Sequence, residues 1–286
     1  AVALCSASED TQLAVVSSLW DDLLESGVIM DMALLFRSNR AECSPSLLRL
    51  ITERAVKGCM RGPLRSANFD ILAVLARLKQ FATVLHCLPD TVAKNERILV
   101  PLSENDAIPA EYLARLVRDT MPLNVARSIA ARPDMPPEVL LAVADRYLQV
   151  GKSGGVFDFS VAFSMAGNPA APPEVLARIA TYERTNICIS LRQVLARNPN
   201  TPAKYLSVYA FDYWGVVREN ALQNPSLPLK TIRKVYMLAD RDPDRLHILT
   251  ALAENPSCPD DILMGLILDR DLFVSAVARK VLAQRR

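Results

Sequence analysis

The chain has 286 residues, of which 51% are apolar and only 6% aromatic, with 9 Gly and 19 Pro. This length allows one elongated domain or two smaller ones, and the composition favours helices over β-sandwiches or barrels. Lys and Arg (33) nearly balance Asp and Glu (31), and the formal charge of +2 excludes a strongly basic nucleic-acid wrapper and an acidic disordered tail.

Residues 1–97 carry helical patterns but no recognisable repeat. The patterns run over residues 10–26, 45–58 and 68–88. No stretch rich in Gly, Ser or Pro separates this region from the rest of the chain. We therefore expect a helical N-terminal cap or degenerate repeats, and the alternative is a separate compact domain.

Residues 98–286 are organised by a repeat in which two prolines recur. The copies begin at Asn105, Arg132, Asn168, Asn198, Asn224 and Asn255, and their spacings are 27, 36, 30, 26 and 31 residues. A residue that precedes Pro avoids the helical region, so the Asn-Pro step ends one helix, and the second Pro marks the start of the next. In the repeat that begins at Asn198, Thr201 directly precedes the second Pro and is expected to cap the helix that starts there. We expect the Asn column to satisfy backbone groups at helix ends.

Apolar residues within each repeat recur at the spacing of a buried helix face. Four residues after the second Pro stand Leu113, Leu140, Leu176, Leu206, Ile232 and Leu263, and seven residues before the next Asn stand Ile98, Val125, Val161, Leu191, Val217 and Ile248. These two series predict a first helix after the second Pro and a second helix before the next Asn. Stacking of such pairs predicts an all-α fold, a right-handed α-solenoid of stacked helix pairs.

The repeat resembles that of the leucine-rich repeat variant proteins, whose units read approximately VRxxVAxNPxxPxxxLxxLA. The segments Val217–Pro225 and Ala130–Leu140 match this pattern closely, and the resemblance covers residues 98–286. It implies a superhelix related to those of HEAT and armadillo repeats. The spacing here is longer than in the family, which indicates fuller helices in some repeats, and the longest spacing comes from an insertion around residues 150–155.

The usual elements of catalytic and metal sites are absent from the sequence. The six cysteines lie at least 16 residues apart, which excludes a CxxC metal knuckle and a dense disulfide framework and makes a reducing, cytoplasmic setting the default. His86 and His247 are 161 residues apart and belong to no nucleophile or metal motif. The Gly151-Lys152-Ser153 segment lacks the first Gly of a phosphate loop, since Arg146 stands there. We expect a loop there, and a protein that is not an enzyme and needs no cofactor or metal.

No membrane association is expected either. No apolar run reaches the roughly 18 residues that span a bilayer. The opening Ala1 to Cys5 has no basic leader and no full apolar segment, so it is not an intact signal peptide.

Polar residues of the second helices form the candidate binding surface. They stand six, five or four places before the Asn of the next repeat: Arg127, Arg192, Gln193, Arg218 and Glu219, with Arg279 in the last half-repeat. The same column of successive repeats lines one surface of a solenoid, so these residues are predicted to bind a partner. In the alternative interpretation, each Arg pairs with an acid such as Asp212, Asp242 or Asp271 and holds adjacent repeats together.

Aromatic residues gather in one part of the chain, from Tyr205 to Trp214. Tyr205, Tyr209 and Tyr213 share one helical face and suggest a stacking platform for a peptide or a base, although Tyr213 and Trp214 stand at the following turn. Tyr209, however, occupies a column that Leu, Val and Ile fill in other repeats, which indicates core packing. Tyr213 and Trp214 join the predicted partner-binding residues.

These observations predict a non-enzymatic scaffold that binds a protein or peptide along its extended surface. The alternative is a nucleic-acid-binding module like some HEAT-like solenoids. The charge gives this alternative little support, since residues 105–286 carry 22 basic and 19 acidic residues (+3) and residues 1–104 carry 11 and 12 (−1). A third possibility is an enzyme with its active groups in the first hundred residues, where no motif stands out.

Overall fold

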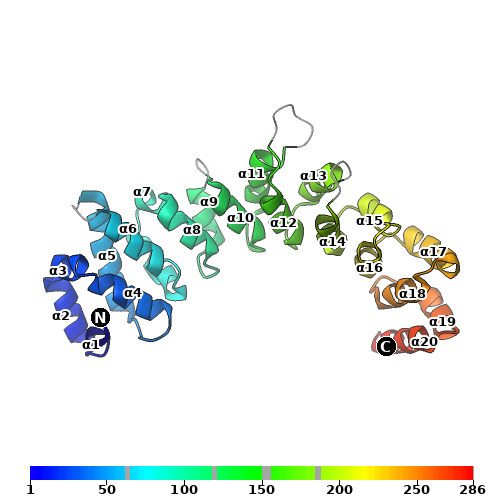
Figure 1. Cartoon of the computed structure of the whole chain (residues 1–286), viewed down its shortest axis with the longest axis horizontal. Helices are drawn as coiled ribbons and strands as arrows, with labels where there is room; N and C mark the ends of the chain where they lie inside the picture. Colours follow the sequence, from blue (N-terminus) through cyan, green and yellow to red (C-terminus); the bar gives the residue numbers. More distant parts are fainter. Residues whose placement is uncertain (62–64, 118–120, 150–155, 184–187, 286) are drawn as a thin grey trace. The chain divides into compact units, whose positions relative to one another are not determined.

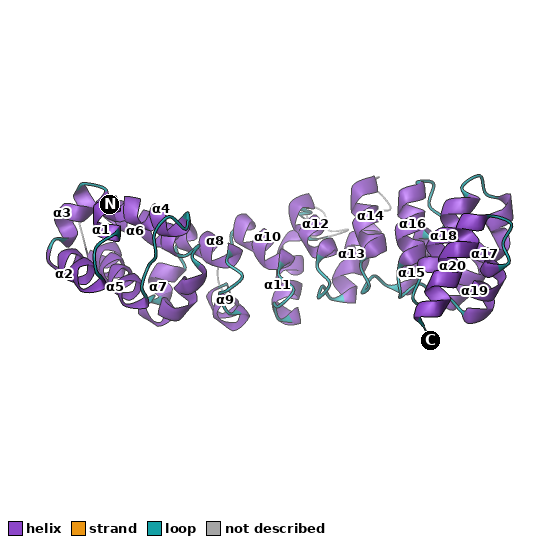
Figure 2. Cartoon of the chain, turned by 90° about the horizontal axis from the view of Figure 1, so that it is seen from below, coloured by secondary structure: helices purple, strands orange, loops and turns teal. Residues whose placement is uncertain are grey.

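A computed structural model describes residues 1–61, 65–117, 121–149, 156–183 and 188–285, apart from the side chains of Arg61 and Glu183. The described residues are mainly helical and include no strand beyond the isolated bridge between Leu148 and Phe157, which confirms the all-α prediction (Figures 1 and 2). The predicted insertion and its Gly151-Lys152-Ser153 loop lie outside the described residues. Within the described ranges, no helix is both long and apolar enough to cross a bilayer.

The chain divides into two units, Ala1–Pro136 (unit 1) and Pro137–Arg286 (unit 2). The helices of unit 1 are α1 (Val2–Cys5), α2 (Glu9–Ser18), α3 (Trp20–Glu25), α4 (Val28–Arg37), α5 (Pro45–Arg61), α6 (Arg65–Leu75), η1 (Lys79–Cys87), α7 (Asp90–Ala93), α8 (Glu96–Glu104), α9 (Ala110–Leu116) and α10 (Leu123–Ala131). The boundary predicted between residues 97 and 98 falls inside α8, so the repeat pattern begins within unit 1.

Alternate helices pack against one another in unit 1. Helix α4 contacts α6, α6 contacts α8, and α8 contacts α10. The helical pattern predicted over residues 10–26 is interrupted at Leu19, and the one over residues 68–88 becomes α6 followed by a 3-10 helix. Helix α4 starts after Gly27, whose φ of +76° is a left-handed conformation that glycine adopts without steric cost.

Unit 2 consists of two rows of helices (Figures 1 and 2). The first helices of its repeats are α11 (Pro137–Tyr147), α13 (Pro173–Glu183), α15 (Ala203–Tyr209), α17 (Leu229–Leu238) and α19 (Asp260–Ile267), and the second helices are α12 (Phe159–Gly167), α14 (Ile189–Arg197), α16 (Gly215–Gln223), α18 (Arg245–Glu254) and α20 (Leu272–Gln284). The short 3-10 helix η2 (Ala239–Arg241) follows α17. Each second helix contacts the next one, in the order α12, α14, α16, α18 and α20.

The helix ends predicted from the prolines are confirmed in both units. Every second helix from α8 to α18 ends at the residue before the Asn column, and each first helix begins directly after its second Pro. The prediction that Thr201 caps α15 is wrong. Pro202 is the N-cap residue, and the Thr201 hydroxyl instead donates a hydrogen bond to the Leu195 carbonyl (2.6 Å), which satisfies the end of α14.

The predicted core is also confirmed. All residues four places after the second Pro and seven places before the next Asn are buried, from Leu113 to Leu263 in the first helices and from Ile98 to Ile248 in the second. Apolar burial of this kind stabilises by roughly 25 cal/mol per Å². Each helix pair therefore contributes both of its apolar faces to one continuous core within its unit.

The Asn column joins each repeat to the preceding one. The Asn224 amide donates to the carbonyl oxygens of Ala196 (2.8 Å) and Asn198 (2.9 Å), and its side-chain oxygen accepts from the Ser226 N–H (2.9 Å). Asn105, Asn198 and Asn255 make the same three kinds of contact. Because all four are buried, every polar atom of the amide has a structural use.

Asn105 also extends the repeat pattern backwards. Its amide donates to the carbonyls of Ala76 (2.8 Å) and Leu78 (2.9 Å). By analogy with the contacts of Asn224, Leu78 holds the place of the Asn in a preceding repeat. The apolar residue at this position explains why no Asn-Pro signature marks it in the sequence.

Two arginines replace Asn in the column and make similar contacts. Arg132 donates to the carbonyls of Asn105 (2.9 Å) and Ile108 (2.7 Å), and Arg285 donates to those of Asn255 (2.9 Å) and Cys258 (2.7 Å). Each arginine also pairs with a carboxylate, Asp134 for Arg132 and Asp260 for Arg285. The guanidinium thus supplies the donors that the amide supplies elsewhere.

Candidate functional site

The second helices of unit 2 carry most of the predicted binding residues. On α14, the buried residues Leu191 and Leu195 face the first helices, and Gln193 lies on the opposite side. Glu219 has the same place on α16 and is exposed. We call the side of α14, α16, α18 and α20 that is turned away from the first helices the second-helix face.

Arg192 on α14 is held by an acid of the following repeat. Its Nη1 lies 2.5 Å from Oδ2 of Asp212, in the loop between α15 and α16. The two side chains are only 16% and 5% exposed. Asp212 also accepts a hydrogen bond from the Trp214 N–H (2.9 Å), which fixes the turn that leads into α16. The pair therefore connects neighbouring repeats.

Arg218 on α16 is enclosed in the same way. Its guanidinium forms an ion pair with Asp244 and lies 3.9 Å from Oδ1 of Asp242, both in the loop before α18. It also donates to the main-chain carbonyls of Asp212 (2.8 Å) and Tyr213 (3.2 Å). Arg218 therefore connects the loop before α16 with the loop before α18.

A third pair of this kind was not identified from the sequence. Arg245 on α18 lies 2.5 Å from Asp269 and 2.7 Å from Asp240. Burial raises the pKa of Asp269, but the hydrogen bonds from Arg245 and from the Asp271 N–H outweigh it and hold that pKa below its ordinary value. We call Arg192–Asp212, Arg218–Asp244 and Arg245–Asp269 the Arg–Asp ladder.

The alternative interpretation, in which the arginines pair with acids of the adjacent repeat, therefore holds for Arg192 and Arg218. One of the three acids that it named is wrong. Asp271 forms no ion pair with an arginine of the described residues. It caps α20 instead by accepting from the N–H groups of Phe273 (2.8 Å) and Val274 (3.4 Å). The signal that was missed is the turn made by Asp212, Asp242 and Asp269, in which each carboxylate accepts the N–H two residues later.

The remaining charged candidates have no such partner. Arg127 is exposed on α10 of unit 1, and Arg279 is exposed on α20 of unit 2. Neither they nor Glu219 forms an ion pair with another described residue. The half-buried side chain of Gln193 is likewise unengaged within the described part of unit 2. These side chains remain available to another molecule.

The aromatic candidates separate into core and surface. Tyr205 and Tyr209 are buried, and the Tyr205 hydroxyl shares a 2.7 Å hydrogen bond with that of Thr181. The three-tyrosine platform is therefore wrong, because α15 ends at Tyr209 before Tyr213 is reached. Core packing of Tyr209 is confirmed. Tyr213 is 85% exposed, and its ring meets that of Trp214 edge to face with centroids 5.4 Å apart.

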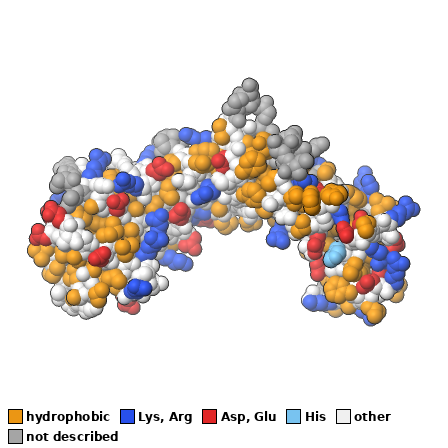
Figure 3. All heavy atoms as spheres, in the orientation of Figure 1, with side chains coloured by type: hydrophobic (Ala, Val, Ile, Leu, Met, Phe, Trp, Pro, Cys, Tyr) orange, Lys and Arg blue, Asp and Glu red, His pale blue; other side chains and the backbone are white. Residues whose placement is uncertain are grey.

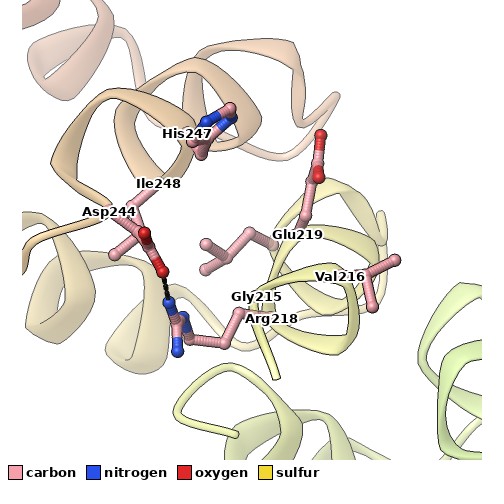
Figure 4. Close-up of a pocket in the computed structure, with 8 residues that line it drawn as sticks. Gly215, Val216, Arg218, Glu219, Asp244, His247 and Ile248 are labelled. Carbon is pink, nitrogen blue, oxygen red and sulfur yellow. Dashed lines mark hydrogen bonds and ion pairs between the residues drawn. The ribbon is translucent and has the colours of Figure 1, made fainter. Parts of the chain in front are cut away.

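A cavity of about 220 Å³ lies between α16 and α18 (Figure 4). Its lining comprises Gly215, Val216, Arg218, Glu219, Leu222, Asp244, His247 and Ile248. Leu222 and Ile248 are buried, whereas Glu219 and His247 are exposed. Figure 4 shows Glu219 on α16 and His247 on α18, and it shows Asp244 bonded to Arg218.

Burial affects the chemistry of several cysteines in the described ranges. Burial raises the pKa of Cys59 and Cys258 to about 11 and that of Cys43 to about 12, so these thiols are poor nucleophiles at neutral pH. No three His, Cys, Asp or Glu side chains of the described residues lie close enough together to hold a metal ion.

Comparison of the chain with models of protein families, with curated proteins and with solved structures finds no match.

Proposed function

We propose that the chain is a right-handed α-solenoid of stacked helix pairs, similar to leucine-rich repeat variant and HEAT proteins, and that it is a scaffold and not an enzyme. In this proposal, a protein or peptide partner binds along the second-helix face of unit 2. The packing of each second helix on the next, together with the repeated Asn contacts, supports the stacking.

The observation that carries the binding proposal is a difference between two sets of polar side chains. Arg192, Arg218 and Arg245 are engaged in the Arg–Asp ladder. Gln193 and Glu219, on the same helices, have no such engagement in the described part of the chain. A structural role for the ladder therefore leaves Gln193, Glu219 and Arg279 as the residues with which this surface recognises a partner, and Tyr213 and Trp214 lie at its edge.

A protein or peptide is a better candidate than a nucleic acid. Binding to a nucleic acid draws its affinity from Lys and Arg side chains that neutralise phosphates. The arginines of the ladder already have carboxylate partners. Figure 3 shows basic and acidic side chains interspersed over the described surface of each unit, with no continuous basic stripe in that view.

Affinity capture with two matched variants tests the proposal. The second-helix variant combines Gln193→Glu with Arg279→Glu, and the first-helix variant combines Ala203→Glu with Lys230→Glu, so both change the net charge by −3. None of the four side chains takes part in a hydrogen bond or ion pair with a described residue, and Ala203 and Lys230 are exposed on α15 and α17.

Native lysate from the source cells is passed over the wild-type chain and both variants, and captured proteins are identified by mass spectrometry. We expect a partner that the wild type and the first-helix variant retain and the second-helix variant loses, with at least about a tenfold weaker Kd when that partner is purified and titrated. Equal retention by both variants would contradict the proposal. Capture of nucleic acid with affinity that falls steeply with salt would favour the alternative.

A further inference from the structure

We propose that the cavity between α16 and α18 accepts an arginine side chain of an extended peptide. This assignment rests on the proposed function, and it names the chemistry that one part of the second-helix face would recognise. At about 220 Å³, the cavity is smaller than the roughly 300 Å³ at which pockets for drug-sized ligands begin, so its size suits a single side chain.

The charge of the lining favours a cation. The cavity is lined by two carboxylates, Glu219 and Asp244, and by one guanidinium, that of Arg218. Arg218 is paired with Asp244, and Asp242 lies 3.9 Å from the same guanidinium. The lining itself therefore holds two negative charges against one positive charge, and Asp242 lies outside it. The excess falls on Glu219, which is exposed and unpaired within the described residues, and on Asp244, whose side chain is still 47% exposed.

The shape of the lining favours arginine over a small cation. Val216, Leu222 and Ile248 supply apolar wall against which the methylene stem of a basic side chain packs. Glu219 comes from α16, whereas Asp244 and His247 lie at and within the start of α18, so polar groups stand on both sides of the cavity (Figure 4). The five donors of a planar guanidinium can reach acceptors on two sides, which the compact ammonium of lysine does less well.

The experiment uses the heptapeptide Ac-Ala-Ala-Ala-Arg-Ala-Ala-Ala-NH2, with versions in which citrulline or lysine replaces arginine. Binding to the full chain is followed by the NMR signals of the histidine rings. The sequence has only two histidines, so His247 reports on the cavity and His86, in unit 1, is the internal control. The His247→Gln variant assigns the signals.

We expect the arginine peptide to shift the His247 signals saturably and to leave those of His86 unchanged. Citrulline, which has nearly the same shape without the charge, should bind at least about tenfold more weakly, and lysine should be intermediate. Glu219→Gln should weaken the arginine peptide about fivefold or more, whereas the matched variant Glu174→Gln, exposed on α13, should not change its affinity.

Equal binding of the arginine and citrulline peptides, or no movement of the His247 signals at millimolar arginine peptide, would overturn the proposal. The substitutions Gln193→Glu and Arg279→Glu lie outside the cavity lining. If the arginine peptide does not bind but the Gln193→Glu/Arg279→Glu variant still loses its partner, the cavity assignment is wrong and the proposed function stands. If the arginine peptide binds but the Gln193→Glu/Arg279→Glu variant retains every partner of the wild type, the cavity assignment stands and the proposed function is wrong.

Discussion

In the described residues, unit 2 connects neighbouring helix pairs through two sets of polar contacts, whereas unit 1 does so through one. In both units, buried amide or guanidinium groups of the Asn column hold the carbonyls of the preceding repeat. Among the described residues, which do not include 118–120 before α10, a second row of contacts, the Arg–Asp ladder, joins second helices to the following loops in unit 2 alone. The ion pairs of unit 1 that join separate elements, such as Arg77–Glu104 (from the turn after α6 to α8) and Arg115–Asp90, are longer and more exposed.

This difference indicates that every repeat requires the hydrogen bonds of the Asn column, whereas only some repeats add an ion pair of the Arg–Asp ladder. Helix ends leave carbonyl groups without partners, and a buried carbonyl without a donor is costly, so each repeat needs the column. Buried ion pairs lose much of their attraction to desolvation and are not needed for stacking itself. We therefore expect losses in the Asn column to be severe in both units and losses in the ladder to be confined to unit 2.

The largest effect is expected from removing a column amide. Asn255→Ala in unit 2 and Asn105→Ala in unit 1 should each lower the free energy of unfolding by about 3 kcal/mol, because two buried carbonyls and one N–H lose their partners. The two tryptophans, Trp20 in unit 1 and Trp214 in unit 2, allow fluorescence of single-tryptophan variants in urea to follow each unit. A loss below about 1 kcal/mol in either unit would contradict a shared requirement.

An intermediate effect is expected in the ladder. Asp212→Asn keeps the shape of the side chain but removes the negative charge 2.5 Å from the largely buried Arg192, and it should cost about 2 kcal/mol, seen in the Trp214 signal alone. The matched control is Asp145→Asn, which removes the partner of Arg178 from an exposed pair at 2.6 Å and should cost less than about 0.5 kcal/mol. Equal costs would mean that the ladder is no more than a set of surface pairs.

Acidification should weaken both units. The pKa of Asp134 in unit 1 is held below its ordinary value chiefly by the hydrogen bond from Arg132, and the pKa of Asp269 in unit 2 is also lowered. Because the folded state binds these protons less tightly than the unfolded state, the stabilisation is present above the ordinary pKa of about 3.9 and is lost as the pH falls through the lower folded values.

Urea unfolding of unit 2 between pH 6 and pH 3 should therefore depend less on pH in Asp269→Asn than in the wild type. The response of unit 1, followed through Trp20, should stay the same in that variant. An unchanged pH dependence of unit 2 would show that Asp269 does not contribute through its charge.

The helix ends and the core were predictable because their causes are local. A proline restricts the residue before it and itself, and the periodicity of Leu, Val and Ile marks one face of a helix. Those signals placed the starts of the first helices and the ends of the second helices from α8 to α19 within a residue or so. The repeat that includes Leu78 was not predicted, because the contact there is made by the Leu78 main-chain carbonyl, which accepts from Asn105, and no Asn marks the position in the sequence.

The Arg–Asp ladder and the cavity could not be predicted from the sequence, because they depend on loop lengths and on helix packing that no local sequence signal determines. Arg192 and Arg218 reach acids 20 and 26 residues away, because the loop after α17 contains η2 and the loop after α15 does not. Arg245 stands ten places before Asn255, and the place six residues before that Asn holds the buried Leu249, so the arginine column misses the pair with Asp269. In the cavity, Glu219 and His247 come from different helices, so only the packing of α16 on α18 brings them to one site.

The central claim is that donated hydrogen bonds of the column amides join successive helix pairs. Asn224→Asp tests it most directly, because a carboxylate has the same shape and still accepts the Ser226 N–H but cannot donate to the carbonyls of Ala196 and Asn198. At pH 7 it should lower the free energy of unfolding, measured in urea through Trp214, by at least about 3 kcal/mol. Asn220→Asp, on the same helix, gives up only a 3.3 Å hydrogen bond to the Gln193 carbonyl at a half-exposed site and should cost less than about 1 kcal/mol. Equal and small losses in the two variants would contradict the account.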